Sequence, residues 1–274
     1  MMLADGWTQA LDAPIFDALR LLLGRLPTDR FPRHDDLNAL VSGLVVSRGG
    51  APIRFVPPAT PSKEISAQYE VRIFKTGEVQ TRPDNWHDLF NALVWLAFPK
   101  TKAVLNGHHY EEIHVRRGEP LRGTARDVLT LFDEGGIVVA STDMELSALL
   151  LEFQWKELFW KRRAEVLKSM RFYVFGHAIY EKALEPYKGV TAKALILEVA
   201  PALFDASLAL QLSQLDARAA NYFSGTQALT STRNLSPLPI LGIPGWEPAN
   251  ACEGYYDDRA QFRPGRSSES AARK

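Results

Sequence analysis

The spacing of apolar residues divides the chain into helical and extended stretches. Apolar positions that recur every three or four residues predict helices with one buried face. Pro99 either ends the helix before it or begins a further helix through residue 113. The predicted helical segments are 14–24, 33–47, 85–98, 143–165, 177–185 and 203–225.

Short β-rich or alternating runs predict strands at 51–58, 66–82, 170–175 and 193–199. In the second run, Tyr69, Val71 and Ile73 fall on one face of an extended chain. A β-hairpin is predicted over 127–141, because two such runs flank Gly135 and Gly136. The helix over 177–185 is short for a parallel crossover, so the relative direction of the strands around it stays open.

The last forty residues have a different character. Residues 235–264 are dense in proline, glycine and aromatic residues, which predicts an irregular arm packed over the body, and residues 265–274 are expected to fray. The pattern as a whole predicts an α+β fold. We expect a single compact domain over residues 1–264, with a mostly antiparallel sheet covered by helices.

Composition narrows the class of protein. The chain has 274 residues, 46% of them hydrophobic, which is enough for a substantial core. Lys plus Arg and Asp plus Glu each number 32, a balance without the electrostatic footprint of a general nucleic-acid or anionic-membrane binder. The single cysteine, Cys252, excludes an internal disulfide framework. No signal peptide or membrane span is expected, and we predict a cytoplasmic protein.

One predicted helix carries a narrow polar wedge. In segment 85–98, His87, Asp88 and Asn91 lie within about 100° of one another around the helix axis, and the other faces are apolar. A helix of this kind is buried, so its polar groups need partners. With Asn85 as N-cap, Asp88 can bond back to the Asn85 backbone, which would explain it as a helix start. His87 suits a metal ligand, a proton acceptor or an ordinary buried histidine.

A second cluster lies in the helix over 177–185. His177 and Glu181 are four residues apart on one face, with Glu185 a turn further on. Two ligands at this spacing can hold one metal ion, although a histidine and a glutamate so placed can also simply hydrogen-bond to each other. Asp133 and Glu134 could add a carboxylate if the predicted turn folds over both helices. A divalent metal is therefore a possible cofactor. Further polar candidates for this site are Asn106, His108 and His109.

Several long phrases of the sequence resemble a known family. These are "YEVRIFKTGEVQTRPDNWHDLFNALVWLAFPKTKAVLN", "LTLFDEGGIVV", "FGHAIYEKALEP", "LSPLPILGIPGW" and "YYDDRAQFRP". Together they are similar to the bacterial family catalogued as domain of unknown function 3025, over about residues 38–263. The resemblance implies no reaction, so it assigns no catalytic role to any residue.

Three functions fit these patterns. The first is a hydrolase, metal-assisted or using general acid–base chemistry, with His87, His177, Asp88, Glu181 and Asn91 as candidate catalytic residues. The second is a non-catalytic protein that binds a ligand or partner and whose polar wedges are structural networks. The third is a nucleic-acid or ribosome-associated factor, which needs the arginines of 116–126 and 156–171 to converge. Sequence motifs such as HExxH, the P-loop and GxSxG are absent.

Overall fold

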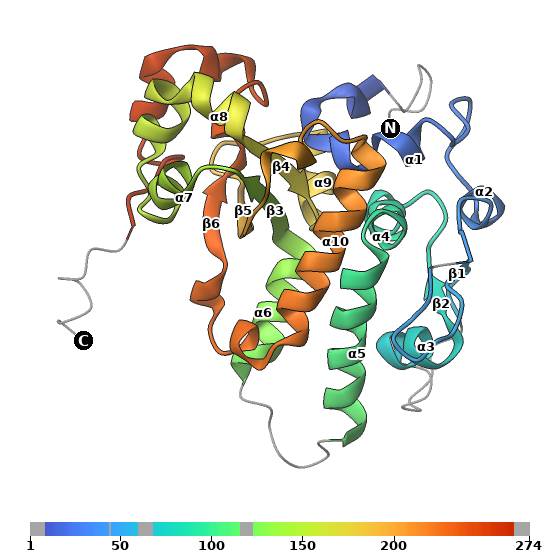
Figure 1. Ribbon diagram of the computed structural model, residues 1–274. Coiled ribbons are helices and arrows are strands. Elements are labelled where there is room, and N and C mark those ends of the chain that lie inside the picture. The colour runs from blue at the N-terminus through green and yellow to red at the C-terminus, as the bar shows by residue number, and fades with distance from the viewer. Residues whose placement is uncertain (1–8, 44, 60–67, 116–122, 266–274) are drawn as a thin grey trace.

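The computed structural model describes residues 9–43, 45–59, 68–115 and 123–265. A four-stranded sheet lies at the centre, and long helices pack side by side below it in the view of Figure 1. Buried apolar side chains form one cluster from Leu11 to Phe262. The α-helices are α1 (Arg20–Leu23), α2 (His34–Asn38), α3 (Tyr69–Thr76), α4 (Trp86–Ala97), α5 (Pro99–Val115), α6 (Gly123–Gly135), α7 (Met144–Leu151), α8 (Arg163–Ser169), α9 (His177–Leu184) and α10 (Leu208–Ser224).

The strands form two sheets. In the larger sheet the order is β4 (Met170–Val174), β3 (Gly136–Ser141), β5 (Thr191–Glu198) and β6 (Ser236–Pro239). The outer pairings, β3 with β4 and β5 with β6, are antiparallel, whereas the central pairing of β3 with β5 is parallel. The α+β class is confirmed, with a mixed sheet. Because β3 separates β4 from β5, α9 joins two strands that run in opposite directions and are not neighbours.

The predicted hairpin over 127–141 is wrong. Residues Gly123–Gly135 form α6, and only Gly136–Ser141 form a strand. Val128, Leu129 and Phe132 are buried at helical spacing, and this period outweighs their β propensity. The glycine pair therefore joins a helix to a strand. Strand β3 is buried at every position, as expected for a strand with neighbours on both edges and layers on both faces.

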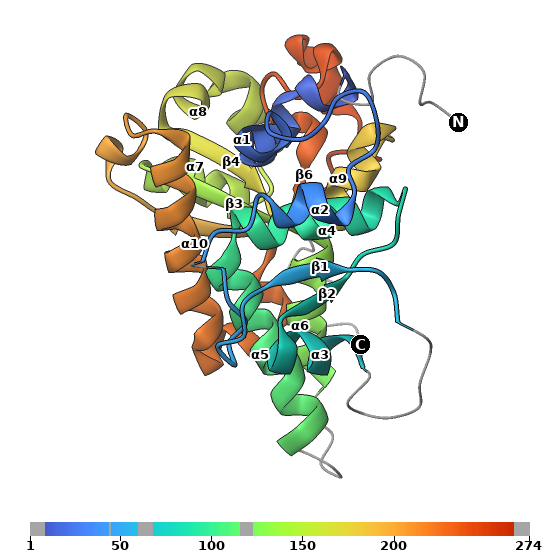
Figure 2. The same cartoon turned by 90° about the vertical axis from the view of Figure 1, so that its right-hand side faces the viewer.

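The predicted strand over 66–82 is also largely wrong. Tyr69–Thr76 form α3, which ends at Gly77 with φ +72°, and only Glu78–Gln80 form a strand, β2. A side chain at Gly77 would meet the Pro52 carbonyl oxygen at 1.9 Å, so glycine is required by both conformation and space. Strand β2 pairs in parallel with β1 (Arg54–Val56), and these two strands form the second sheet (Figure 2).

The C-terminal arm begins as part of the sheet. Residues 236–239 form edge strand β6, where Pro237 and Pro239 are tolerated because an edge strand leaves some N–H groups without a partner strand. The rest is built from short 3₁₀ turns, and Leu238, Ile240 and Phe262 are buried as predicted. Of the tail predicted to fray, only Gly265 lies within the described residues.

The remaining helices keep the predicted positions with different bounds. The helix predicted over 33–47 is limited to α2, and 143–165 is divided among α7, a π-helical turn at Glu157–Lys161 and α8. Pro99 begins a helix rather than only ending one, since α5 starts there. Within the described ranges, none of the helices has the length and apolar character needed to cross a bilayer.

Glu78 joins three elements and gives a pH-dependent prediction. Its carboxylate binds Arg54 on β1 and Arg72 on α3, and the hydrogen bond from Arg72 lowers its pKa below the usual 4.5. A lowered folded-state pKa stabilises the protein above pH 4.5, and this stabilisation is lost as the pH falls through the folded value. Glu78→Gln is expected to lower the free energy of unfolding by about 1 kcal/mol at pH 7.

This difference between Glu78→Gln and the wild type should shrink below pH 4.5. Urea unfolding at pH 7 and at two acid values measures it, with Glu185→Gln, at an exposed carboxylate, as control. A deficit that stays constant through the acid range would contradict an ion-pair origin.

Candidate metal site

The ends of three helices bring the candidate ligands together. Helix α9 packs against both α4 and α6, so His177 at its start faces His87 in the first turn of α4 and Glu134 near the end of α6. Gly176 makes this approach possible, because a side chain there would lie 2.5 Å from the Glu134 carbonyl oxygen and from the Gly136 nitrogen. The Gly176 N–H donates to the Gly136 carbonyl at 2.8 Å and fixes the junction.

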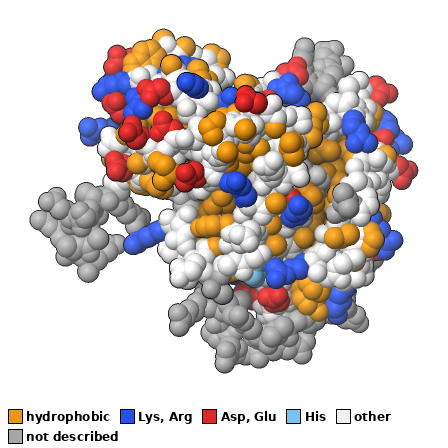
Figure 3. Space-filling model, viewed as in Figure 1, with side chains coloured by type: hydrophobic (Ala, Val, Ile, Leu, Met, Phe, Trp, Pro, Cys, Tyr) orange, Lys and Arg blue, Asp and Glu red, His pale blue; other side chains and the backbone are white. Residues whose placement is uncertain are grey.

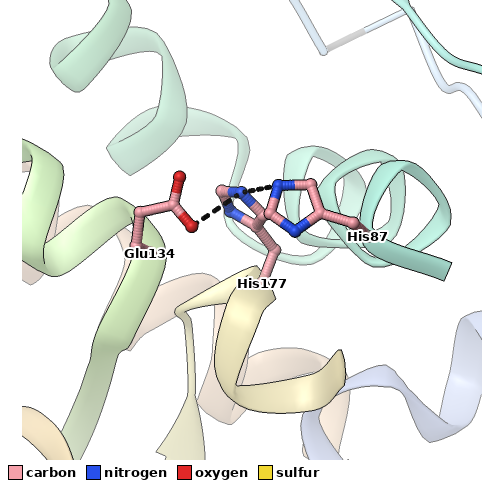
Figure 4. A group of neighbouring side chains, drawn as sticks. All are labelled: His87, Glu134 and His177. Atoms are coloured by element: carbon pink, nitrogen blue, oxygen red, sulfur yellow. Dashed lines mark hydrogen bonds and ion pairs between the residues drawn. The ribbon is translucent and has the colours of Figure 1, made fainter. Parts of the chain in front are cut away.

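Figure 4 shows the two imidazole rings and the carboxylate directed toward one another. The Nε2 atoms of His87 and His177 are 3.1 Å apart, and the ring centroids are 4.5 Å apart. The Glu134 Oε2 atom lies 3.5 Å from His177 Nε2. One ligand atom from each of the three residues lies within 4.8 Å of the others. Two nitrogens bound to one zinc ion at about 2.0 to 2.1 Å are separated by a little over 3 Å, so the histidine pair fits a shared ion.

The hydrogen bonds around His87 assign its proton. Its Nδ1 lies 2.9 Å from Glu181 Oε2, and a carboxylate can only accept, so Nδ1 carries the hydrogen and Nε2 presents a lone pair toward the cluster. A carboxylate that holds the second nitrogen of a metal-binding histidine is a recurrent feature of metal sites. Glu181 therefore orients His87, and the interaction with His177 lowers the pKa of Glu134 and keeps it ionised.

The cluster is buried on one side and open on the other. The His177 side chain is 5% exposed, whereas those of His87 and Glu134 are 32% and 47% exposed. Catalytic metal sites keep one coordination position open for water or substrate, while structural sites are closed. This exposure gives a small molecule access to the cluster from the side of His87 and Glu134.

Asp88 occupies a different position from its neighbour. The Asn85 side chain accepts from the Asp88 N–H at 3.0 Å, so Asn85 is the N-cap of α4, as predicted. The Asp88 carboxylate, however, accepts from the backbone N–H and the guanidinium of Arg82 rather than from the Asn85 backbone. Burial raises the Asp88 pKa, but the bonds from Arg82 outweigh it and lower the value. Asp88 fixes the entry to α4 and lies outside the group of metal-ligand atoms.

Asn91 joins a second polar network beside the cluster. Its Oδ1 accepts from the Lys102 ammonium at 2.9 Å, and its Nδ2 donates to the Tyr69 hydroxyl at 2.7 Å. Lys102 also donates to Asp133 at 2.7 Å. Burial raises the pKa of Asp133, but the charge and hydrogen bond of Lys102, together with smaller contributions from nearby side chains, outweigh this effect and lower the pKa. Sequence patterns predicted Asn91 but missed Lys102 and Tyr69; the detectable signal was a lysine among the apolar residues that follow Pro99.

A pocket of about 480 Å³ opens next to Glu134. Four of its nine lining residues carry a carboxylate, and one of these, Glu134, also belongs to the cluster. Burial raises the pKa of Glu70, which also accepts from the Asn106 side chain at 2.6 Å. The lining residues are Gln68, Glu70, His109, Glu112, Ile113, Arg126, Thr130, Asp133 and Glu134.

The other candidates have structural partners or lie apart. His108 bonds to the Phe223 carbonyl at 2.9 Å, and Cys252 is exposed on the arm. Of the basic segments, 116–122 lie outside the described residues. On the face shown in Figure 3, Lys and Arg side chains lie among Asp and Glu rather than in one basic patch. Lys156 pairs with Glu253 and Asp257.

A model of one protein family matches residues 53–266 and carries the description "Protein of unknown function (DUF3025)". No curated protein and no solved structure matches the chain. The matched span contains α4, α6 and α9, and therefore every ligand atom of the cluster.

Proposed function

The chain belongs to the DUF3025 family, and we propose that it is a metal-dependent hydrolase whose ion is held by His87, Glu134 and His177. The observation that carries the proposal is the convergence of two imidazole Nε2 atoms and one carboxylate from three separate helices. Two histidines and a glutamate are a recurrent ligand set of hydrolytic zinc enzymes. Zinc bound this way lowers the pKa of its water to about 7 and supplies a nucleophile near neutral pH.

The surroundings favour a neutral or cationic substrate over a phosphate ester. The pocket beside Glu134 carries Glu70, Glu112 and Asp133, against the cationic Arg126 and the Lys102 ammonium that pairs with Asp133, so carboxylates still outnumber these cations. These charges repel a phosphate group more than a carbonyl compound. Hydrolysis of an amide or ester bond is therefore the reaction class that we propose. We also propose that it takes place in the cytoplasm, which the single exposed cysteine favours.

Elemental analysis of the purified protein tests the proposal directly. The proposal is supported if the protein holds one zinc ion per chain and hydrolyses members of a panel of activated esters and amides. A chelator should abolish this hydrolysis, and added zinc should restore it. If iron is the only stoichiometric metal, the site is instead that of an oxygen-activating iron enzyme, because such enzymes use the same ligand set. Full ester hydrolysis after complete removal of metal would contradict it.

A second candidate, metal-free acid–base catalysis, rests on His177 Nδ1. This atom is buried and has no hydrogen-bond partner among the described residues. Without metal, the His177 proton sits on Nε2 and is donated to His87 Nε2, so that Glu181, His87 and His177 form a chain. A metal at Nε2 would move the proton to Nδ1, where the described residues offer no acceptor. Retained activity without metal selects this alternative.

Glu181→Ala tests the orienting role of the Glu181 carboxylate. Loss of the partner of His87 Nδ1 is expected to weaken zinc affinity about tenfold to a hundredfold, because outer hydrogen bonds fix the ring and its tautomer. Competition with a chromophoric chelator measures the affinity. Glu185→Ala, at the residue that follows α9, is the matched control and should bind zinc as the wild type does. Equal affinities in both variants would show that Glu181 is dispensable.

A further inference from the structure

We propose that the Tyr69 hydroxyl donates a hydrogen bond to the substrate oxygen that becomes negatively charged at the metal site. The inference rests on the proposed function and deepens it by naming a group that would stabilise the transition state. Tyr69 is the first residue of α3. Together with Asn91 and Lys102 it forms a chain of hydrogen bonds, here called the tyrosine relay, whose polarity is fixed at each link.

The ammonium end of the tyrosine relay sets its direction. Lys102 Nζ has only donors, so the oxygen of the Asn91 amide faces it and the amide nitrogen faces Tyr69. The Tyr69 oxygen is therefore an acceptor in this bond, and its own O–H remains to be donated elsewhere. Among the described residues no acceptor takes it. Tyr69 is 36% exposed as a whole residue, and its neighbours Gln68 and Glu70 line the pocket, so we place the proton within reach of a ligand bound there.

The tyrosine relay is anchored to the same elements as the metal ligands. Asn91 follows His87 by four residues on α4, so the two side chains project from the same face, with Cβ atoms about 5 to 6 Å apart. At the other end, Lys102 binds Asp133, the residue before Glu134 on α6. The relay therefore runs alongside the cluster, and the start of α3 borders the pocket through its N-cap residue Gln68 and through Glu70.

The electrostatic setting keeps Tyr69 a donor. Although part of the residue is exposed, the hydroxyl end lies in poorly solvated surroundings, and this desolvation together with the nearby Glu70 carboxylate raises the pKa of Tyr69 above the usual 10. The hydroxyl therefore keeps its proton at neutral pH. The donated Asn91 N–H, itself polarised by the Lys102 ammonium, makes the O–H a stronger donor. Preorganised donors of this kind stabilise the oxyanion of acyl transfer when they point at the place where charge develops.

Acetohydroxamate, which binds a metal ion through two oxygens, is a suitable probe. Titrated into cobalt-loaded protein, it can be followed by the visible absorption of the ion. Tyr69→Phe is expected to bind it about tenfold or more weakly, because a hydrogen bond to a charged oxygen is lost, while cobalt affinity is unchanged. Tyr187→Phe, at an exposed tyrosine, is the matched control and should bind like the wild type.

Asn91→Asp is a second test that keeps the tyrosine. A carboxylate in this place accepts from both Lys102 and Tyr69, so the tyrosine proton turns away from the ligand, and the same weakening is expected. If both variants bind cobalt and acetohydroxamate as tightly as the wild type does, the role of Tyr69 is overturned while the metal site stands. Failure of the wild type to bind cobalt would overturn the metal site and this inference together.

Discussion

His177→Ala is expected to weaken zinc affinity by more than about a hundredfold, because loss of a direct ligand costs more than the tenfold to hundredfold loss of an outer partner. The variant removes one of only three ligand atoms in the cluster. Chelator competition measures the affinity. His34→Ala is the matched control, since His34 is bonded to the Thr81 carbonyl and lies outside the cluster.

Thermal unfolding gives an independent measurement of the same prediction. A ligand at a thousand times its dissociation constant stabilises the folded state by about 4 kcal/mol. The wild type and His34→Ala should therefore melt at a higher temperature with zinc, and His177→Ala should lose this shift. If His177→Ala keeps both the shift and the affinity, zinc binds elsewhere and the cluster is a structural hydrogen-bond network.

The polar wedge of α4 could be predicted because its physics is local. A helix that is apolar on its remaining faces leaves only one direction for polar groups, and each of them has a partner in the structure. His87 meets Glu181, Asp88 meets Arg82, and Asn91 meets Lys102. The identity of those partners is a tertiary property. Ninety residues separate the two histidines, and no spacing within either helix encodes the approach of α9 to α4.

Glu134 was predicted to lie near the histidines, but the secondary structure predicted for its segment was incorrect. The predicted hairpin would have put it at a turn between two strands, whereas it stands in the last turn of α6. A glycine pair fits a hairpin turn and a helix–strand junction equally well, and only the helical spacing of Val128 and Phe132 separates the two. The residue type was informative, and the element was decided by packing against the sheet.

Tyr69 was missed for a related reason. Over a short run, alternating apolar residues such as Tyr69, Val71 and Ile73 fit a strand, while the same run fits an amphipathic helix once Phe74 is counted. The deciding element was Gly77, which ends α3 in a left-handed conformation that a strand does not need. Because this run was predicted as a strand, no sequence pattern placed Tyr69 beside Asn91, and the tyrosine relay was not predicted.

Lys102→Met is expected to lower the free energy of unfolding by about 3 kcal/mol, because it leaves a carboxylate and an amide oxygen without their donor. The Lys102 side chain is 5% exposed, and its ammonium donates to Asp133 and Asn91 and lies 5.4 Å from the Trp95 ring centroid. Methionine fills a similar volume, so lost charge pairing rather than a cavity dominates the effect. Urea unfolding measures it, with Lys182→Met on α9 as a control of the same chemistry.

The double variant Lys102→Met with Asp133→Asn separates the cost of an orphaned charge from the value of the pair. Removing one partner of a buried ion pair is far more damaging than removing both, since the remaining charge loses its counterion in a poorly solvated place. The double variant should therefore recover at least half of the stability lost in Lys102→Met. If the stability losses of the two single variants, Lys102→Met and Asp133→Asn, simply add in the double variant, Asp133 does not depend on Lys102. The ammonium then acts through Asn91 alone. In that case the stability of the fold and the orientation of the Asn91 amide would depend on the same hydrogen bond.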